Sequence, residues 1–328
     1  MSQVKKNIAI VAGGDSSEVV VSLKSAAGLY SFMDKERYNI FIVTIVGKVW
    51  QVEWSETEKI AIDKNDFSFE REGQKITFDF AYITIHGTPG ENGILQGYFE
   101  LIGLPYSCCG VLAAAVTFNK FTCNQYLKGF GVKVSESLVL RKGQSVSNEE
   151  VAEKIGFPCF VKPNVGGSSF GVTKVKSIEQ LQPAITLAFA EGDEVMIEAF
   201  MAGTEITCGI YKTKTKSQVL PVTEVVSENE FFDYDAKYKG QVQEITPARI
   251  SAELTNRVQQ LTSAIYDILG CKGIVRIDYI ISEGDVINLL EVNTTPGMTT
   301  TSFIPQQIAA AGLAIKDVMT EIIENELI

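Results

Sequence analysis

Residues 273–297, GIVRIDYIISEGDVINLLEVNTTPG, constrain the possible folds of this chain more than any other segment. Two apolar runs flank a Ser-Glu-Gly-Asp turn, a pattern that predicts an antiparallel β-hairpin. A turn centred on the Glu-Gly pair would place Arg276 opposite Glu291 and Asp278 opposite Leu289. The chain therefore contains a long antiparallel element whose polar residues lie toward the end away from its turn.

Side chains alternate along each strand, so the hairpin has one polar and one apolar face. The polar face carries Arg276, Asp278, Glu291 and Asn293. The opposite face carries Val275, Ile277, Tyr279, Leu290 and Val292, which suit core packing. Two carboxylates and an amide oxygen are hard ligands of the kind that Mg²⁺ uses together with substrate phosphates. A permanently cationic arginine beside them could stabilise developing negative charge. The alternative is a simple Arg276–Glu291 salt bridge on a hydrated sheet face.

The composition of the 328 residues is that of a globular protein, with 45% hydrophobic and 21% charged residues. The net charge of −11 disfavours general binding of nucleic acid. The apolar runs are too short to span a membrane, and the run NIAIVA at residues 7–12 is too short for a signal-peptide core. The six cysteines form no CxxC pair, and with a single histidine they suit no zinc site. Reduced thiols in a cytoplasm are the simplest account.

The order of elements predicts an α/β unit followed by two α+β units. Strands at 7–12 and 38–46 flank a helix that runs to about Met33, which indicates a parallel sheet with crossover helices. One further helix is expected over 111–129. Longer strands follow from about residue 202, including 216–226 and the hairpin. The expected domains are an N-terminal α/β substrate domain at 1–119, a central subdomain at 120–202 and a C-terminal subdomain at 203–328.

Residues 158–175 place Gly166, Gly167 and Gly171 in a Gly/Ser loop between two short strands. Lys162 lies at the end of the first strand. The backbone amides of such a loop can surround phosphate oxygens while a lysine supplies positive charge. The loop lacks the Walker A spacing and is followed by a strand, so it is neither a P-loop nor a dinucleotide-binding fingerprint. A flexible hairpin loop is the alternative.

Three further segments combine charge with a suitable position in the predicted fold. His86 is the only histidine and ends a predicted strand, at the edge of a parallel sheet where ligands bind. Glu18 lies in the first turn of a helix after a Gly-Gly turn. Residues 228–240 mix aromatic and charged residues without periodicity, as an active-site lid does. Each has an ordinary alternative: a structural histidine, a carboxylate favoured by the helix dipole, and a solvated surface loop.

Taken together, these segments resemble the D-alanine–D-alanine ligases of the ATP-grasp superfamily. The resemblance covers nearly the whole chain, and its motifs keep the order of the family. They are GGDSSE, HGTPGENG, FNK, VKPNVGGSSFG, EAFMAGTE, FFDYDAKY, VRIDY and LLEVNTTPGMTTTSFIP. The resemblance implies an ATP-grasp fold in which two α+β domains hold ATP between their sheets, behind the N-terminal parallel-sheet domain.

The resemblance also implies a set of binding residues for ATP and two Mg²⁺ ions, with Mn²⁺ as the alternative ion. The residues expected at the nucleotide are Lys120, Phe160, Lys162, Ser168, Ser169, Glu198, Ala199, Met201, Glu205, Lys237 and Asn293. The expected metal ligands are Asp278, Glu291 and Asn293, which agrees with the polar face of the predicted hairpin.

The implied reaction joins two D-alanines to D-alanyl-D-alanine, for peptidoglycan precursors, through an acyl phosphate formed from ATP. Glu18 would bind the ammonium group of the first D-alanine, and His86 would lie near its carboxylate. Arg276 and the N–H of Gly297 would stabilise the oxyanion, while Ser302 and the backbone at Phe303 would hold the second D-alanine. Glu18, Ser168 and Tyr238 would form a hydrogen-bonded link that holds the lid. The resemblance further implies a cytoplasmic homodimer.

The sequence departs from the family pattern at Val19 and Val20, where a polar pair is common, and at Phe303, where leucine is frequent. Three other readings remain. A different ATP-grasp carboxylate–amine ligase would use the same phosphate loop and hairpin face. A non-catalytic nucleotide-binding regulator could keep the same fold. A dinucleotide-dependent oxidoreductase would need a GxGxxG motif that Gly13-Gly14 do not supply.

Overall fold

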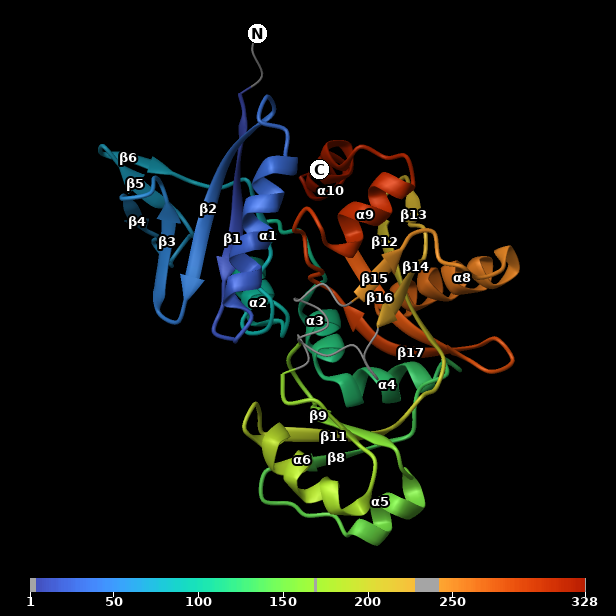
Figure 1. The fold of residues 1–328 in the computed structure, drawn as a ribbon. Coiled ribbons are helices and arrows are strands. Elements are labelled where there is room, and N and C mark those ends of the chain that lie inside the picture. The colour runs from blue at the N-terminus through green and yellow to red at the C-terminus, as the bar shows by residue number, and fades with distance from the viewer. Residues whose placement is uncertain (1–3, 168–169, 228–241, 328) are drawn as a thin grey trace.

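The structure is a computed structural model that describes residues 4–167, 170–227 and 242–327. Its three main sheets occupy three parts of the molecule (Figure 1). We call them the N-terminal, central and C-terminal sheets. They arise from consecutive stretches of the chain, in agreement with an α/β unit followed by two α+β units. The domain boundaries at 119 and 202 stay a prediction.

The N-terminal sheet has the strand order β4-β3-β2-β1-β7. Its strands are β1 (Lys6–Gly13), β2 (Tyr38–Val46), β3 (Val49–Glu53), β4 (Lys59–Ala61) and β7 (Phe80–Ile83). β1 pairs in parallel with both β2 and β7, as the strand–helix–strand pattern predicts. β3 and β4 add an antiparallel edge, because Gly47 adopts φ +53° and allows a tight turn after β2. A separate small hairpin joins β5 (Phe69–Arg71) and β6 (Gln74–Ile76).

The helices of this half are α1 (Val19–Phe32), α2 (Ile94–Ile102), α3 (Val111–Phe118) and α4 (Lys120–Lys128). The prediction of one helix over 111–129 is wrong, because Asn119 adopts an extended conformation that divides this segment into two helices. The Asn119 side chain accepts a hydrogen bond from the Thr122 N–H at 2.9 Å and so caps a new helix. This break directs the N-terminus of α4 toward the Gly/Ser loop.

The central sheet is antiparallel throughout, with the order β10-β9-β11-β8. Its elements are β8 (Ser137–Arg141), α5 (Asn148–Lys154), β9 (Cys159–Pro163), β10 (Thr173–Val175), the 3₁₀ helix η1 (Ile178–Gln180), α6 (Leu181–Phe189) and β11 (Glu194–Ala199). Figure 1 shows α5 and α6 on the same side of the sheet, so the other face is left for the cavity described below.

The C-terminal sheet contains the order β15-β14-β12-β16-β17, with β13 also paired to β12. Its strands are β12 (Thr204–Lys212), β13 (Ser217–Val219), β14 (Thr223–Ser227), β15 (Val242–Ile245), β16 (Gly273–Ser282) and β17 (Val286–Asn293). Its helices are α8 (Ala252–Ile268), α9 (Phe303–Ala310) and α10 (Ile315–Glu326). The expected single strand at 216–226 is divided around Pro221, which has no N–H to donate to a ladder.

Some hydrophobic clusters contain residues from one sheet and its helices, and others combine residues from two parts of the molecule. One cluster lies wholly within the central unit, from Leu138 to Ile197. A second cluster joins strand and helix residues of the N-terminal half, such as Ile10 and Leu29, to Ile308 and Met319 of the C-terminal helices. A third joins α3 and α4 to the C-terminal sheet. A fourth cluster, which includes Phe67 and Phe99, lies wholly within the N-terminal half. The N-terminal and C-terminal parts therefore share two clusters, whereas the unit from β8 to β11, which we call the central unit, shares none of the four.

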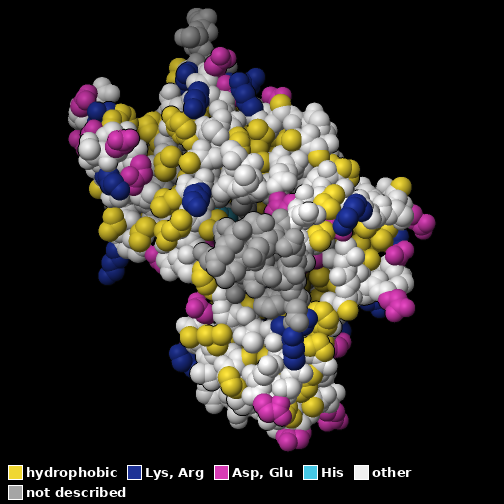
Figure 2. All heavy atoms as spheres, viewed as in Figure 1, with side chains coloured by type: hydrophobic (Ala, Val, Ile, Leu, Met, Phe, Trp, Pro, Cys, Tyr) yellow, Lys and Arg dark blue, Asp and Glu magenta, His cyan; other side chains and the backbone are white. Residues whose placement is uncertain are grey.

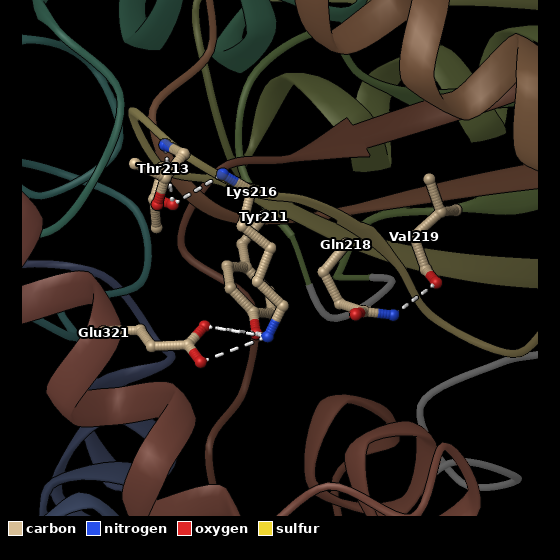
Figure 3. A network of polar contacts seen from close by, with 7 residues as sticks. Tyr211, Thr213, Lys216, Gln218, Val219 and Glu321 are labelled. Atoms are coloured by element: carbon tan, nitrogen blue, oxygen red, sulfur yellow. Dashed lines mark hydrogen bonds and ion pairs between the residues drawn. The ribbon is translucent and has the colours of Figure 1, made fainter.

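A polar network fixes the last helix onto the C-terminal sheet (Figure 3). Tyr211 Oη donates to Glu321 Oε2 at 2.9 Å, and Lys216 Nζ reaches both Glu321 carboxylate oxygens at 3.1 and 3.0 Å. Tyr211 is fully buried at the position where β12 passes under α10. The network holds α10 in place, and α10 in turn packs against α1 of the N-terminal half.

Candidate active site

The β16–β17 hairpin is present, but its predicted register is wrong. Arg276 pairs with Asn293 and Asp278 pairs with Glu291. The turn holds three residues rather than two, because Gly284 and the following residue both adopt positive φ, 74° and 55°. The polar face survives this change, because the longer turn and an extra residue in β17 each shift the register by one residue. Together they displace β17 by two residues against β16, which keeps the same alternate residues on one face.

A β-bulge next to the polar cluster decides which of two consecutive leucines faces the core. Tyr279 pairs with Leu289, so Leu290 is the extra residue. Leu289 is fully buried in the core, and Leu290 instead lines the cavity beside the polar face. The prediction that Leu290 packs in the core is therefore wrong, because alternation alone does not reveal a bulge.

The four polar residues of the hairpin are in direct contact. Arg276 Nε and Nη2 donate to Asp278 Oδ1 and Oδ2 at 2.9 and 2.8 Å, and Nη2 lies 3.9 Å from Glu291 Oε1. Asn293 Nδ2 donates to Asp278 Oδ2 at 3.0 Å. Burial by itself lowers the pKa of the Arg276 guanidinium, but the Asp278 carboxylate outweighs burial and raises it. The arginine is thus the cation that holds two neighbouring carboxylates together.

The same donor set suits Mg²⁺. Within the described ranges no three His, Cys, Asp or Glu side chains gather into a metal cluster. The hairpin supplies two carboxylates, on Asp278 and Glu291, and one amide, on Asn293. Mg²⁺ is commonly bound by one or two carboxylates plus substrate phosphates, so these residues fit it. Rotation of the Asn293 amide by half a turn would present its oxygen to a cation in place of its nitrogen.

A cavity of ≈ 560 Å³ lies between the central and C-terminal sheets. Of the predicted nucleotide and metal residues, those that line it are Lys120, Phe160, Lys162, Glu198, Ala199, Met201, Glu205, Asp278 and Glu291. Lys162 Nζ donates to Glu198 Oε2 at 2.6 Å across the neighbouring strands β9 and β11. The Glu198 side chain is 2% exposed, and its Oε1 has no hydrogen-bond partner among the residues that the structure describes. A buried acceptor without a donor, next to a lysine, marks this wall as a place for a polar ligand.

The Gly/Ser loop lies against the start of α4. Lys120 Nζ donates to the Gly166 carbonyl, and the Lys120 N–H donates to the Asn164 carbonyl at 3.0 Å. Gly167 passes so close to Glu18 that an added Cβ would lie 2.9 Å from the Glu18 carboxylate. The predicted loop residues Ser168 and Ser169 and the lid residues Lys237 and Tyr238 lie outside the described residues.

A second cavity of ≈ 490 Å³ adjoins the first. The predicted substrate residues that line it are Glu18, His86, Arg276, Gly297, Ser302 and Phe303, and Asn293 lines it too. Glu18 is the N-cap of α1 rather than part of its first turn. Glu18, Lys120, Arg276, Glu291 and Phe303 line both cavities, so the two form one continuous site.

Polar contacts hold the residues around the second cavity. His86 follows β7, is 7% exposed and lies with Nε2 3.4 Å from Ser25 Oγ. Ser302 is the N-cap of α9, and its Oγ accepts a hydrogen bond from the Thr299 N–H at 3.1 Å. An added Cβ at Gly297 would lie 3.1 Å from Ser302 Oγ, so glycine permits this turn to close.

Glu91 is a cavity residue to which the sequence analysis gave no role. It lines the second cavity, and its Oε2 accepts a hydrogen bond from the Gly87 N–H at 2.7 Å. Burial, followed by the negative charge of Glu18, raises the pKa of Glu91 to about 8, although the Gly87 N–H opposes that rise. The segment HGTPGENG contained a signal for this residue, because one tight turn after His86 brings the glutamate back beside the histidine.

Figure 2 shows acidic and basic side chains spread over the viewed face, with hydrophobic side chains gathered on the N-terminal part. None of the described helices combines the length and the apolar character that a bilayer span requires. The interior cavities, rather than a charged patch on this face, are the features that indicate a ligand.

Two sheets that enclose a cavity large enough for a nucleotide, with a lysine on one wall and paired carboxylates on the other, define the ATP-grasp class. Family models described as the N-terminus and the C-terminus of D-ala D-ala ligase match residues 7–109 and 126–324. The chain belongs to the D-alanine–D-alanine ligase family.

Individual relatives agree with this assignment. A D-alanine–D-alanine ligase from Bacteroides fragilis is 72% identical over 323 residues, which cover 98% of this chain and 100% of the relative. A crystal structure of the D-alanine–D-alanine ligase from Bacillus anthracis complexed with ATP is 30% identical, covers 98% of this chain and 97% of that one, and has a TM-score of 0.78. The VanG D-Ala:D-Ser ligase from Enterococcus faecalis is also 30% identical, covers 98% and 99%, and has a TM-score of 0.86.

Proposed function

We propose that this chain joins two D-alanines to D-alanyl-D-alanine at the expense of ATP, for peptidoglycan precursors. The observation that carries the proposal is the continuity of the two cavities at Arg276. One cavity offers a wall with Lys162 and Glu198 for the nucleotide. The other offers Glu18, His86 and Ser302, which suit an amino acid with its ammonium and carboxylate groups. Arg276 borders both.

The first step transfers the γ-phosphoryl group of ATP to the carboxylate of the first D-alanine. Lys120 and Lys162 neutralise phosphate charge, and Glu198 Oε1 supplies a buried acceptor for an amino group such as that of adenine. Asp278, Glu291 and Asn293 would hold Mg²⁺, which supplies charge neutralisation at the transferred phosphoryl group.

The second step is attack of the second D-alanine's amine on the acyl phosphate, with loss of phosphate from a tetrahedral intermediate. The Arg276 guanidinium and the Gly297 N–H suit the oxyanion, because preorganised donors are most effective where charge develops. Ser302 and the backbone at Phe303 suit the carboxylate of the acceptor, at the N-terminus of α9. Ser168 and Tyr238 keep their proposed roles in lid closure.

The proposal includes a cytoplasmic homodimer. The six cysteines are all free thiols, which suits a reducing compartment. Ile94, Leu101 and Leu112 on α2 and α3 expose 62%, 88% and 77% of their surface, and such apolar residues on neighbouring helices suit a second copy of the chain. Sedimentation equilibrium tests this, and Leu112→Glu should dissociate a dimer that uses these helices.

The decisive experiment measures phosphate release from ATP in the presence of D-alanine, L-alanine, or D-alanine with D-lactate or D-serine, and identifies the products by mass. Release that depends on D-alanine, with D-alanyl-D-alanine as product, is expected. The D-serine arm matters because the fold is shared with a D-Ala:D-Ser ligase. A folded protein that binds ATP but releases no phosphate with D-alanine would refute the substrate assignment and leave another acid–amine pair.

A further inference from the structure

Two cysteines that are far apart in the chain meet where the N-terminal half contacts the C-terminal sheet. Cys109 lies between α2 and α3, and Cys271 lies between α8 and β16. The Lys272 N–H donates to Cys109 Sγ at 3.4 Å, and Cys109 Sγ lies 3.5 Å from the Lys272 carbonyl. Cys271 directly precedes Lys272 in the chain, and each of the two thiols shifts the pKa of the other. The two sulfurs are therefore neighbours in the folded chain.

The backbones around the two cysteines are in close contact, so the sulfurs are held together by the fold. Gly273 adopts φ +69°, and an added Cβ would lie 1.8 Å from the Ser107 carbonyl oxygen. Only glycine permits such an approach. Cys109 also belongs to the core cluster that joins α3 and α4 to the C-terminal sheet, and Cys271 packs against the same cluster.

The two thiols differ from each other in exposure and acidity. Cys109 is fully buried, whereas Cys271 is partly exposed. Burial raises the pKa of Cys108, Cys123 and Cys208 to about 12. The pKa of Cys109 is lowered instead, because the neighbouring Cys271 thiol and the Lys272 N–H stabilise its thiolate and outweigh burial. The Cys109 sulfur, together with burial, raises the pKa of Cys271.

We propose that Cys109 and Cys271 form a reversible disulfide, with a peroxide as oxidant, that joins the N-terminal half covalently to the start of β16. Peroxide reaches the pair from the side of Cys271, the partly exposed member. The Cys109 sulfur, which is the more acidic thiol, forms an S–O bond as the O–O bond breaks, and its proton leaves with hydroxide as water. The Cys271 sulfur then attacks the Cys109 sulfur, the S–O bond breaks, and the hydroxide takes the Cys271 proton and leaves as a second water. Two thiols lose two electrons in total, and hydrogen peroxide becomes two waters.

The disulfide would act on stability rather than on the chemistry of the ligase. It closes a long loop of the chain and so restricts the unfolded state. It joins two parts that already share their cores, and it leaves the contacts of the Arg276 cluster unchanged. We therefore expect the oxidised protein to melt roughly 5 °C higher than the reduced protein. Dithiothreitol should restore the original melting temperature.

The test treats the full-length protein with hydrogen peroxide and maps cross-linked peptides by mass spectrometry without reduction. A loss of two hydrogens, a peptide pair joining Cys109 to Cys271, and the rise in melting temperature are expected. Cys271→Ser should lose the cross-link and the rise, while Cys159→Ser, in the core of the central unit, should retain both. Cross-linking to Cys123 instead, or oxidation of Cys271 to sulfinic acid without a cross-link, would overturn the proposal. The peptide map needs no variant, so it stands even if a serine variant folds poorly.

Discussion

The central unit and the joined N- and C-terminal parts bury their apolar residues in different ways. The central core is made by residues from β8 to β11 alone. The other two parts contribute to common cores, in which Ile10 and Leu29 pack with Ile308 and Met319. A unit with its own core can move as a body, whereas parts that share a core cannot separate without exposing apolar surface.

This difference matches the chemistry of the site. Arg276, Glu18 and Ser302, which border the amino-acid cavity, all come from the joined parts. Lys162 and Glu198, on the nucleotide wall, come from the central unit. The reacting groups therefore stand on a rigid frame, and the nucleotide wall can open and close over it. The predictions below test this division, from the largest expected effect to the smallest.

Arg276→Ala should abolish most turnover while ATP binding persists. The variant removes an oxyanion donor, which typically costs about 10²–10³ in turnover, and leaves the Asp278 and Glu291 carboxylates without their cation. Product formation and ATP affinity should be measured together. Arg257→Ala, on an exposed part of α8, is the matched control and should keep full activity. Normal turnover in Arg276→Ala would remove this arginine from the reaction.

Lys162→Met should destabilise the central unit selectively. It leaves the Glu198 carboxylate buried without its partner, which typically costs about 3–5 kcal/mol. Because this unit has its own core, calorimetry should show a separate early transition while the main transition stays in place. The double variant Lys162→Met/Glu198→Leu should recover much of the loss. A single transition shifted as a whole would show that the central unit does not unfold independently.

Leu29→Ala and Leu181→Ala form a matched pair, since both leucines are fully buried. Each should cost about 2–5 kcal/mol. Leu29 packs in the shared core, so its loss should lower the transition of the joined parts. Leu181 packs in the central core, so its loss should lower only the transition of that unit. The comparison fails if both variants shift the same transition.

Glu91→Gln should change how stability depends on pH. The folded protein holds the Glu91 proton up to a pKa of about 8, whereas an unfolded glutamate loses it near 4.5. Stability of the native protein should therefore fall as pH rises between these values, and this cost is complete above pH 8. The variant should be about as stable as the native protein at pH 4 and more stable at pH 9. Thermal melts across this pH range provide the measurement, and Glu283→Gln, in the exposed hairpin turn, should show no such gain at high pH.

Much of the fold follows from local sequence patterns. Apolar residues recur at the spacing expected for the observed structure in three elements: the strand at 38–46, the helix from residue 19 and the final hairpin. The chemistry-bearing residues were also recognisable, because carboxylates on alternate positions of a strand must share a face. All the predicted site residues that the structure describes line one of the two adjoining cavities. Their roles in binding and catalysis remain predictions.

The tertiary structure decided what local patterns cannot encode. The three-residue turn and the bulge at Leu290 set the register of β16 and β17, and they depend on packing against neighbouring strands. Glu91 acquires its raised pKa only from the burial and charges that the folded cavity supplies. Cys109 and Cys271 meet only because the two halves of the chain share a core. The sequence determined the elements and their chemistry, because period and residue type act locally. Contacts between residues far apart in the chain depend on how the whole molecule packs, so local patterns do not reveal them.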